Sequence, residues 1–187
     1  YEGNLTEIQS GVVANLRNTP MVVFQSTDDP RVPPDANQAA VKEVAKFKKR
    51  FGGYADFTYW EVTDRQHGYP EGGMLALLNK IKDFKRDVHQ LNIAWQPALD
   101  WKTQFYWMHW KEPVMTVIVE GEFDKETNTF VISSDALLSD FEILLSPAMV
   151  DFKREVIVKF NGTEIARRMP KANLGDLLYF YSASDGE

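Results

Sequence analysis

The chain has 187 residues, 44% hydrophobic and 26% charged, with a formal net charge of −6, and its length allows one domain or two small ones. This hydrophobic fraction excludes a disordered chain, and the acidic balance argues against a basic surface for nucleic acid. The lack of cysteine excludes disulfides and thiol catalysis, and no apolar run approaches the roughly 18 residues of a membrane span, so we expect a soluble protein.

The first half of the chain predicts alternating strands and helices. Residues 21–24 form an apolar run of strand length, and residues 57–62 form a second run rich in aromatic and β-branched side chains. Between the two runs, apolar side chains recur every three or four positions and so share one helix face. These are Ala36, Ala40, Val44, Phe47 and Phe51. We expect Asp35 to cap this helix, Gly52 to end it, and a second helix over 74–88, an order typical of a parallel sheet.

Beyond Trp95 the pattern becomes all β. Six runs alternate or are apolar at strand length: 105–110, 115–123, 130–133, 141–145, 156–160 and 164–168. Asn161-Gly162 predicts a type I′ hairpin turn, because both residues tolerate positive φ. A helix over 174–181 is expected to pack on this sheet. The change of period divides the chain into an α/β domain over 1–94 and a β domain over 95–187.

The α/β half is predicted to be incomplete. Two parallel strands with two helices leave a sheet edge and much apolar surface uncovered. We therefore expect it to complete a larger sheet whose earlier strands precede Tyr1. The first residue is not Met and no signal segment precedes it, so we expect the chain to begin inside a longer protein, and the sequence is also compatible with a homo-oligomer.

Two titratable residues follow the two predicted strands. Asp29 comes shortly after the first strand and His67 shortly after the second. In open parallel sheets, functional groups sit on the loops beyond the carboxyl ends of the strands. There, a carboxylate could fix the imidazole tautomer while the other ring nitrogen acts as general base. The alternatives are that Asp29 only initiates a turn before Pro30, that His67 is an ordinary loop residue, or that Asp28 is the acid.

The local sequence resembles that of α/β-hydrolases. In residues 21–33, Met-Val-Val-Phe-Gln-Ser-Thr-Asp-Asp-Pro-Arg-Val-Pro, Asp29 matches the acid of that family's catalytic triad. In residues 59–69, Tyr-Trp-Glu-Val-Thr-Asp-Arg-Gln-His-Gly-Tyr, His67 matches the base, and the order acid then histidine also fits. One departure is Gln25-Ser26, where the family often has His-Gly.

This resemblance implies a fold that is α/β plus all-β. The last two strand–helix units of an α/β-hydrolase sheet are followed by a small antiparallel β-sandwich, and residues 145–162 resemble the domain appended to some such enzymes. The implied function is that of a serine esterase or peptidase of the prolyl-oligopeptidase-like or depolymerase-like branches, acting on an ester or peptide. A secreted or periplasmic location is part of the same expectation.

The nucleophile of such an enzyme is missing. No Gly-x-Ser-x-Gly occurs, and Ser10, Ser26 and Ser146 lack the strand-to-helix turn that exposes a reactive hydroxyl. We expect this chain to be inactive alone and its partner to be the missing N-terminal part of the same protein. Neither a glycine-rich phosphate loop nor the spacing of a zinc site is present, so we expect no cofactor and no metal.

The aromatic residues of the second half suggest a different function. Six lie close together: Trp95, Trp101, Phe105, Tyr106, Trp107 and Trp110. An exposed row could stack on sugar rings, which would make the chain a non-catalytic module that binds carbohydrate or protein. The simpler interpretation is that most of them fill the core of the sandwich.

Overall fold

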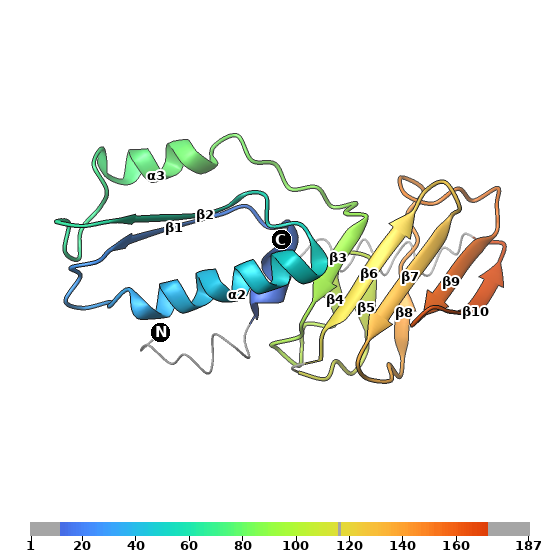
Figure 1. Cartoon of the computed structure of the whole chain (residues 1–187). Coiled ribbons are helices and arrows are strands. Elements are labelled where there is room, and N and C mark those ends of the chain that lie inside the picture. The colour runs from blue at the N-terminus through green and yellow to red at the C-terminus, as the bar shows by residue number, and fades with distance from the viewer. Residues whose placement is uncertain (1–11, 116, 172–187) are drawn as a thin grey trace.

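The computed structural model describes residues 12–115 and 117–171 and is a mixed α/β structure in which strands outnumber helices (Figure 1). The elements in chain order are the 3₁₀ helix η1 (Val12–Asn18), β1 (Met21–Ser26), α2 (Asp35–Phe51), β2 (Phe57–Val62), α3 (Gly73–Ile81), β3 (Asn92–Trp95), β4 (Gln104–Phe105), β5 (Met108–Trp110), β6 (Val119–Asp124), β7 (Thr129–Ser134), β8 (Phe141–Ile143), β9 (Val156–Phe160) and β10 (Thr163–Arg168). The helix predicted over 174–181 lies outside the described residues. None of the described helices combines the length and the apolarity needed to cross a bilayer.

Strands β1 and β2 form a parallel two-stranded sheet, as predicted, with Met21 opposite Phe57 and Ser26 opposite Val62. Figure 1 shows α3 above this sheet and α2 below it. The parallel register matters for the site, because it brings the carboxyl ends of both strands to the same edge.

The cap predicted for α2 is wrong. Pro34, not Asp35, precedes the helix, and it makes no side-chain cap hydrogen bond. The proline ring holds φ at −73°, close to the helical value, and the Pro34 carbonyl accepts from Gln38 N. Asp35 is therefore the first helical residue, where its negative charge suits the helix dipole. The predicted end is confirmed, since Gly52 follows the helix with a φ of 68°.

Helix α3 ends at Ile81 and does not reach Val88 as predicted. Phe84 and Val88 continue the apolar spacing but stay 39% and 52% exposed. Because no packing covers them, nothing outside the local sequence favours a longer helix.

The second half builds two sheets around one core. Five strands pair in the order β10-β9-β7-β6-β3, and three pair in the order β4-β5-β8. Met108 and Trp110 from the smaller sheet and Phe123 and Phe130 from the larger one lie in the same buried cluster. The prediction of purely antiparallel pairing is wrong, since β7 and β9 pair in parallel. The chain between them passes through β8 in the other sheet and so returns in the same direction.

The run 105–110 is not one strand. It divides into β4 and β5 around Tyr106, whose φ of 53° reverses the chain. Trp107 and Met108, which would point to opposite faces in a continuous strand, are both buried here at 3% and 0% exposure. A tight hairpin thus places two large neighbouring side chains in the core.

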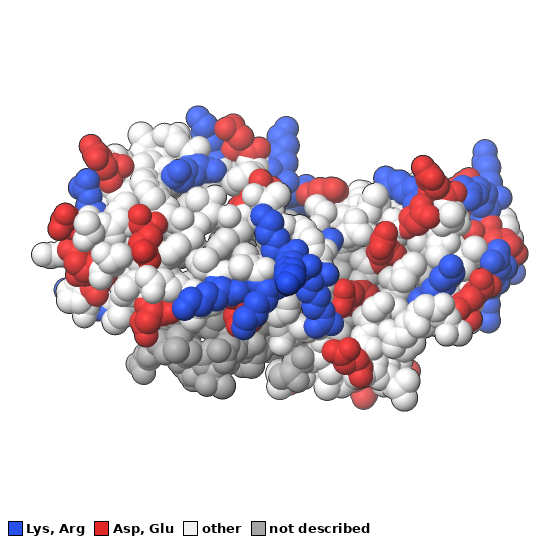
Figure 2. Space-filling view, in the orientation of Figure 1, with Lys and Arg blue, Asp and Glu red and all other residues white. Residues whose placement is uncertain are grey.

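The two halves meet at η1, which was not predicted. Tyr54 Oη donates to Val13 O at 3.1 Å, and Arg17 donates to Phe51 O at the end of α2 and to Asn92 O in β3. On the face drawn in Figure 2, basic side chains gather over α2 beside acidic ones, and Arg50 pairs with Glu120 of β6 at 2.9 Å.

Candidate functional site

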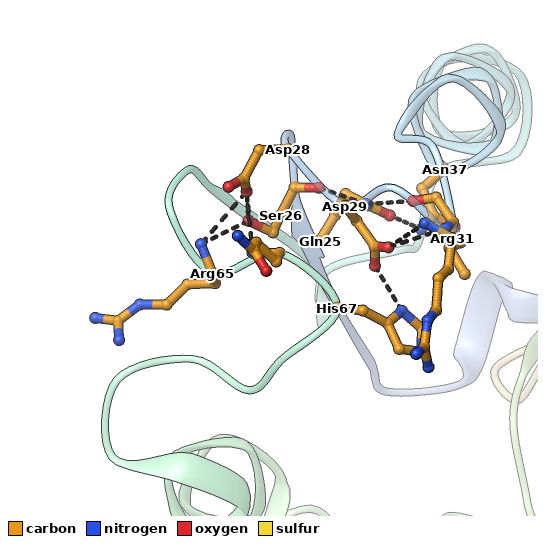
Figure 3. Close-up of polar contacts among 10 residues, drawn as sticks. Gln25, Ser26, Asp28, Asp29, Arg31, Asn37, Arg65 and His67 are labelled. Atoms are coloured by element: carbon orange, nitrogen blue, oxygen red, sulfur yellow. Dashed lines mark hydrogen bonds and ion pairs between the residues drawn. The ribbon is translucent and has the colours of Figure 1, made fainter.

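The structure brings together the two residues that the sequence singles out. Asp29 follows β1 and His67 follows β2, and Asp29 Oδ2 lies 2.9 Å from His67 Nδ1 (Figure 3). The contact spans 38 positions of sequence, and the parallel pairing of the two strands is what closes that gap.

Asp29 also organises its own loop. Its Oδ1 accepts hydrogen bonds from Arg31 N at 2.8 Å and Val32 N at 3.0 Å. The turn predicted as an alternative role therefore coexists with the contact to His67, because each carboxylate oxygen serves one of them. With both oxygens engaged, the side chain is only 10% exposed.

The environment of Asp29 favours its ionised form. Burial by itself would raise the pKa of this carboxyl, but the hydrogen bonds from Val32 N, Arg31 N and His67 outweigh it, so the net shift lowers the pKa. At neutral pH Asp29 is thus a carboxylate, which can only accept hydrogen bonds.

This fixes the tautomer of the neutral His67 ring. Since the carboxylate cannot donate, Nδ1 carries the proton and Nε2 keeps its lone pair. The side chain is 46% exposed, and no group within the described residues hydrogen-bonds Nε2. An imidazole oriented by a carboxylate, with its other nitrogen accessible, can take a proton from a hydroxyl.

Asp28, the competing acid, has a separate set of partners. Its Oδ1 accepts from Ser26 Oγ, from Gln66 N at 3.1 Å and from Arg65 N at 3.3 Å (Figure 3). The Ser26 hydroxyl, and with it the backbone amides of Gln66 and Arg65, lowers the pKa of Asp28. The two neighbouring carboxylates thus bind different groups. Asp29 contacts the imidazole of His67, and Asp28 binds the backbone amides of the two residues before His67.

The position of the Gln25-Ser26 departure is filled by a buried polar network. Gln25 is 3% exposed, and its Nε2 donates to Ser26 O at 2.7 Å and to Val32 O at 2.9 Å. Its Oε1 accepts from Asn37 Nδ2 at 2.6 Å, at the start of α2. These bonds hold the loop that carries Asp29 against the helix. Sequence reasoning missed this role, although two polar residues ending an apolar strand were a visible signal.

The candidate serines that the structure describes do not contact His67. Ser26 Oγ is engaged with Asp28 and Arg65 N, and Ser146 Oγ lies 3.2 Å from His89 Nε2. Ser10 lies outside the described residues. Across the described ranges, no serine hydroxyl hydrogen-bonds His67.

Most of the aromatic cluster is core, as the simpler interpretation holds. Trp95, Trp107 and Trp110 are 1–3% exposed, whereas Trp101 is 72% exposed. Among the residues that the structure describes, no group of three His, Cys, Asp or Glu side chains is placed to hold a metal ion.

In comparisons with protein families, curated proteins and solved structures, nothing matches this chain. The function must therefore be inferred from the geometry of the site.

Proposed function

We propose that this chain is the C-terminal part of a serine esterase or peptidase of the α/β-hydrolase type, in which His67 is the general base and Asp29 orients it. The observation that carries the proposal is the 2.9 Å contact between Asp29 Oδ2 and His67 Nδ1, which leaves Nε2 accessible. The sequence resemblance around both residues adds to it, and the same resemblance favours a secreted or periplasmic location.

In the proposed reaction, His67 moves one proton twice. Nε2 takes the proton of a serine hydroxyl as the serine oxygen attacks the carbonyl carbon of an ester or peptide, and Asp29 stabilises the resulting imidazolium. The same Nε2–H then protonates the leaving alcohol or amine, giving an acyl-enzyme. Water repeats both steps, releasing the acid and restoring the serine. The negative charge on Asp29 is retained throughout.

The nucleophile is proposed to lie on another segment of the same protein, the partner of this chain. Exposed apolar side chains on and after α3 support a covering partner, and no residue of α3 is buried. These side chains are Met74, Leu75, Leu78, Ile81, Phe84 and Val88, with exposures from 39% to 65%. Exposed apolar side chains that gather on one element often mark a surface that another segment covers. Among residues 12–115 and 117–171, the sheet of β1 and β2 has these two strands, and it is likewise open to further pairing.

We further propose that the two sheets of the second half form an appended β-sandwich domain that does not take part in the chemistry. Strand β3 belongs to its larger sheet, so this unit begins at Asn92, close to the predicted boundary at 94/95. The buried aromatic rings are its core.

Hydrolysis assays test the proposal. They use the longer gene product, by which we mean this chain together with the segment proposed to carry the nucleophile. Wild-type protein should hydrolyse a p-nitrophenyl ester or a peptide p-nitroanilide, and His67→Ala should lower kcat at least about 10³-fold. His109→Ala is the matched control, because His109 Nδ1 also contacts a carboxylate, that of Glu142, at 2.9 Å, but on the smaller β-sheet. It should keep full activity. Comparable hydrolysis by the 187-residue chain alone, or an active His67→Ala variant, would contradict the proposal.

A second candidate is a non-catalytic binding module. Trp101 favours it, since this side chain is 72% exposed, and Leu99, two positions earlier in the sequence, is 46% exposed. An exposed indole can stack on a sugar ring. Binding to insoluble glycans that is lost in Trp101→Ala, with no hydrolysis by the longer gene product, would favour this candidate.

A further inference from the structure

We infer that Asp28 is a positioning residue that holds His67 in its working place by binding the backbone turn in front of it. This inference rests on the proposed function, in which the contact between Asp29 and His67 must be maintained. Asp28 does not touch the imidazole. It acts on the imidazole through the turn of residues 64–66.

The β1–β2 sheet ends before it reaches His67. Backbone pairing between β1 and β2 reaches Ser26 and Val62, and the last bond beyond it joins Thr27 N to Val62 O at 2.8 Å. Past this point the two loops diverge, and His67 lies on the β2 side without a ladder to hold it. Asp28 Oδ1 takes the place of a strand carbonyl, since it accepts from the amides of Arg65 and Gln66 across the gap.

The turn of residues 64–66 has a backbone conformation that neighbouring groups must enforce. Asp64 and Gln66 both have positive φ, at 62° and 49°, on either side of Arg65. Residues other than glycine adopt this conformation at a cost, and it persists where surrounding contacts enforce it. Gly68 closes the turn by donating to Arg65 O at 3.0 Å, and a Cβ on Gly68 would lie only 2.8 Å from that oxygen.

Ser26 completes the support. The Ser26 hydroxyl donates to Asp28 Oδ1, and Ser26 Oγ itself accepts from Arg65 N at 3.1 Å. Ser26 is 2% exposed, so the serine end of these two bonds is buried, while Asp28 and Arg65 lie at the surface. The serine therefore both orients the Asp28 carboxylate and binds the turn. It stands at the position where α/β-hydrolases often have glycine.

The two neighbouring acids therefore have different roles. Asp29 sets the tautomer of His67, and Asp28 sets its location. Without Asp28 the turn can relax, and a displacement of about 1 Å in a catalytic group lowers turnover by about 100-fold.

The test compares three variants of this chain by NMR. Asp28→Ala removes the acceptor, Asp28→Asn keeps an acceptor oxygen without the charge, and Asp64→Asn is the control, since it changes charge in the same turn at a side chain that hydrogen-bonds no described residue. Wild type, Asp28→Asn and Asp64→Asn should carry the ring proton on His67 Nδ1, located by ¹⁵N shifts, and show protected amides at Arg65 and Gln66. Asp28→Ala should lose both.

Turnover of the longer gene product is the second readout. Asp28→Ala should lower kcat by about 100-fold with KM within about threefold, and Asp28→Asn should recover most of the loss. If Asp28→Ala does not fold by circular dichroism, Ser26→Ala replaces it, with the same loss of the Nδ1 proton expected.

Two results would overturn the inference. One is an Nδ1 proton and amide protection that survive in the folded Asp28→Ala or Ser26→Ala chain. The other is a wild-type chain without that proton. A longer gene product that hydrolyses nothing would instead refute the proposed function, while the NMR comparison still decides the role of Asp28.

Discussion

Replacing Asp29 with asparagine should invert the tautomer of His67. The new side chain keeps an oxygen that can accept from Arg31 N and Val32 N, which lie 2.8 Å and 3.0 Å from Oδ1 in the wild type. Its NH₂ group then faces His67 Nδ1 in place of Oδ2. Because that group only donates, Nδ1 must accept, and the ring proton moves to Nε2. The nitrogen proposed to receive the serine proton is then blocked.

The expected loss is large, because the geometry is preserved and only the proton is misplaced. Triads in the wrong tautomer lose about 10⁴-fold in kcat, and we expect a loss of that order with little change in KM. The matched control is Glu142→Gln, which makes the same change at the partner of His109. That variant should keep wild-type turnover.

Two measurements follow the effect. Ester hydrolysis by the longer gene product gives kcat, and ¹⁵N NMR of this chain locates the imidazole proton on Nδ1 or on Nε2. If Asp29→Asn keeps its proton on Nδ1, or retains more than a tenth of wild-type kcat, then Asp29 does not set the tautomer and the reasoning is refuted.

Three further predictions concern stability, pH and binding. Phe130→Ala removes a fully buried ring from the β core and should lower the free energy of unfolding by about 3–5 kcal/mol, measured by urea melts followed by tryptophan fluorescence. Its control is Leu137→Ala, at a side chain 90% exposed, which should change the free energy of unfolding by less than about 0.5 kcal/mol. Equal losses in the two variants would contradict this packing. Because the folded pKa of Asp28 lies below the unfolded value of about 3.9, its hydrogen bonds stabilise the fold above that pH, and their contribution disappears as pH falls through the folded pKa. NMR titration of the Asp28 carboxyl carbon should give a midpoint below about 3.9, and a midpoint at or above that value would refute the assignment of its partners. Trp101→Ala should leave the free energy of unfolding within about 0.5 kcal/mol of wild type, and glycan pull-down should detect no binding that depends on this residue.

The contact between Asp29 and His67 could be predicted because it follows from strand direction. Two apolar runs separated by an amphipathic helix predict a parallel pair, and parallel strands end at one edge. Once residues 21–24 and 57–62 are recognised as such strands, the loops after them must be neighbours. The exact acid depended on the family resemblance, and the structure distinguishes the two aspartates by their hydrogen-bond partners.

The support of His67 could not be predicted, because it depends on conformations that the sequence does not mark. The positive φ of Gln66 occurs at a residue that rarely adopts it, so no turn signal announces it. The same holds for the hairpin at Tyr106, which contains no glycine, proline or asparagine in its turn. The parallel pairing of β7 with β9 depends on β8 joining the other sheet, which is a long-range choice.

Mapping the adduct of a fluorophosphonate probe on the longer gene product tests the central claim most directly. We predict one labelled serine, on a peptide upstream of Tyr1, and no labelling in the His67→Ala variant. Failure of the wild-type protein to label, or a label on a serine within residues 1–187, would contradict the assignment of this chain as the acid–base half of a hydrolase.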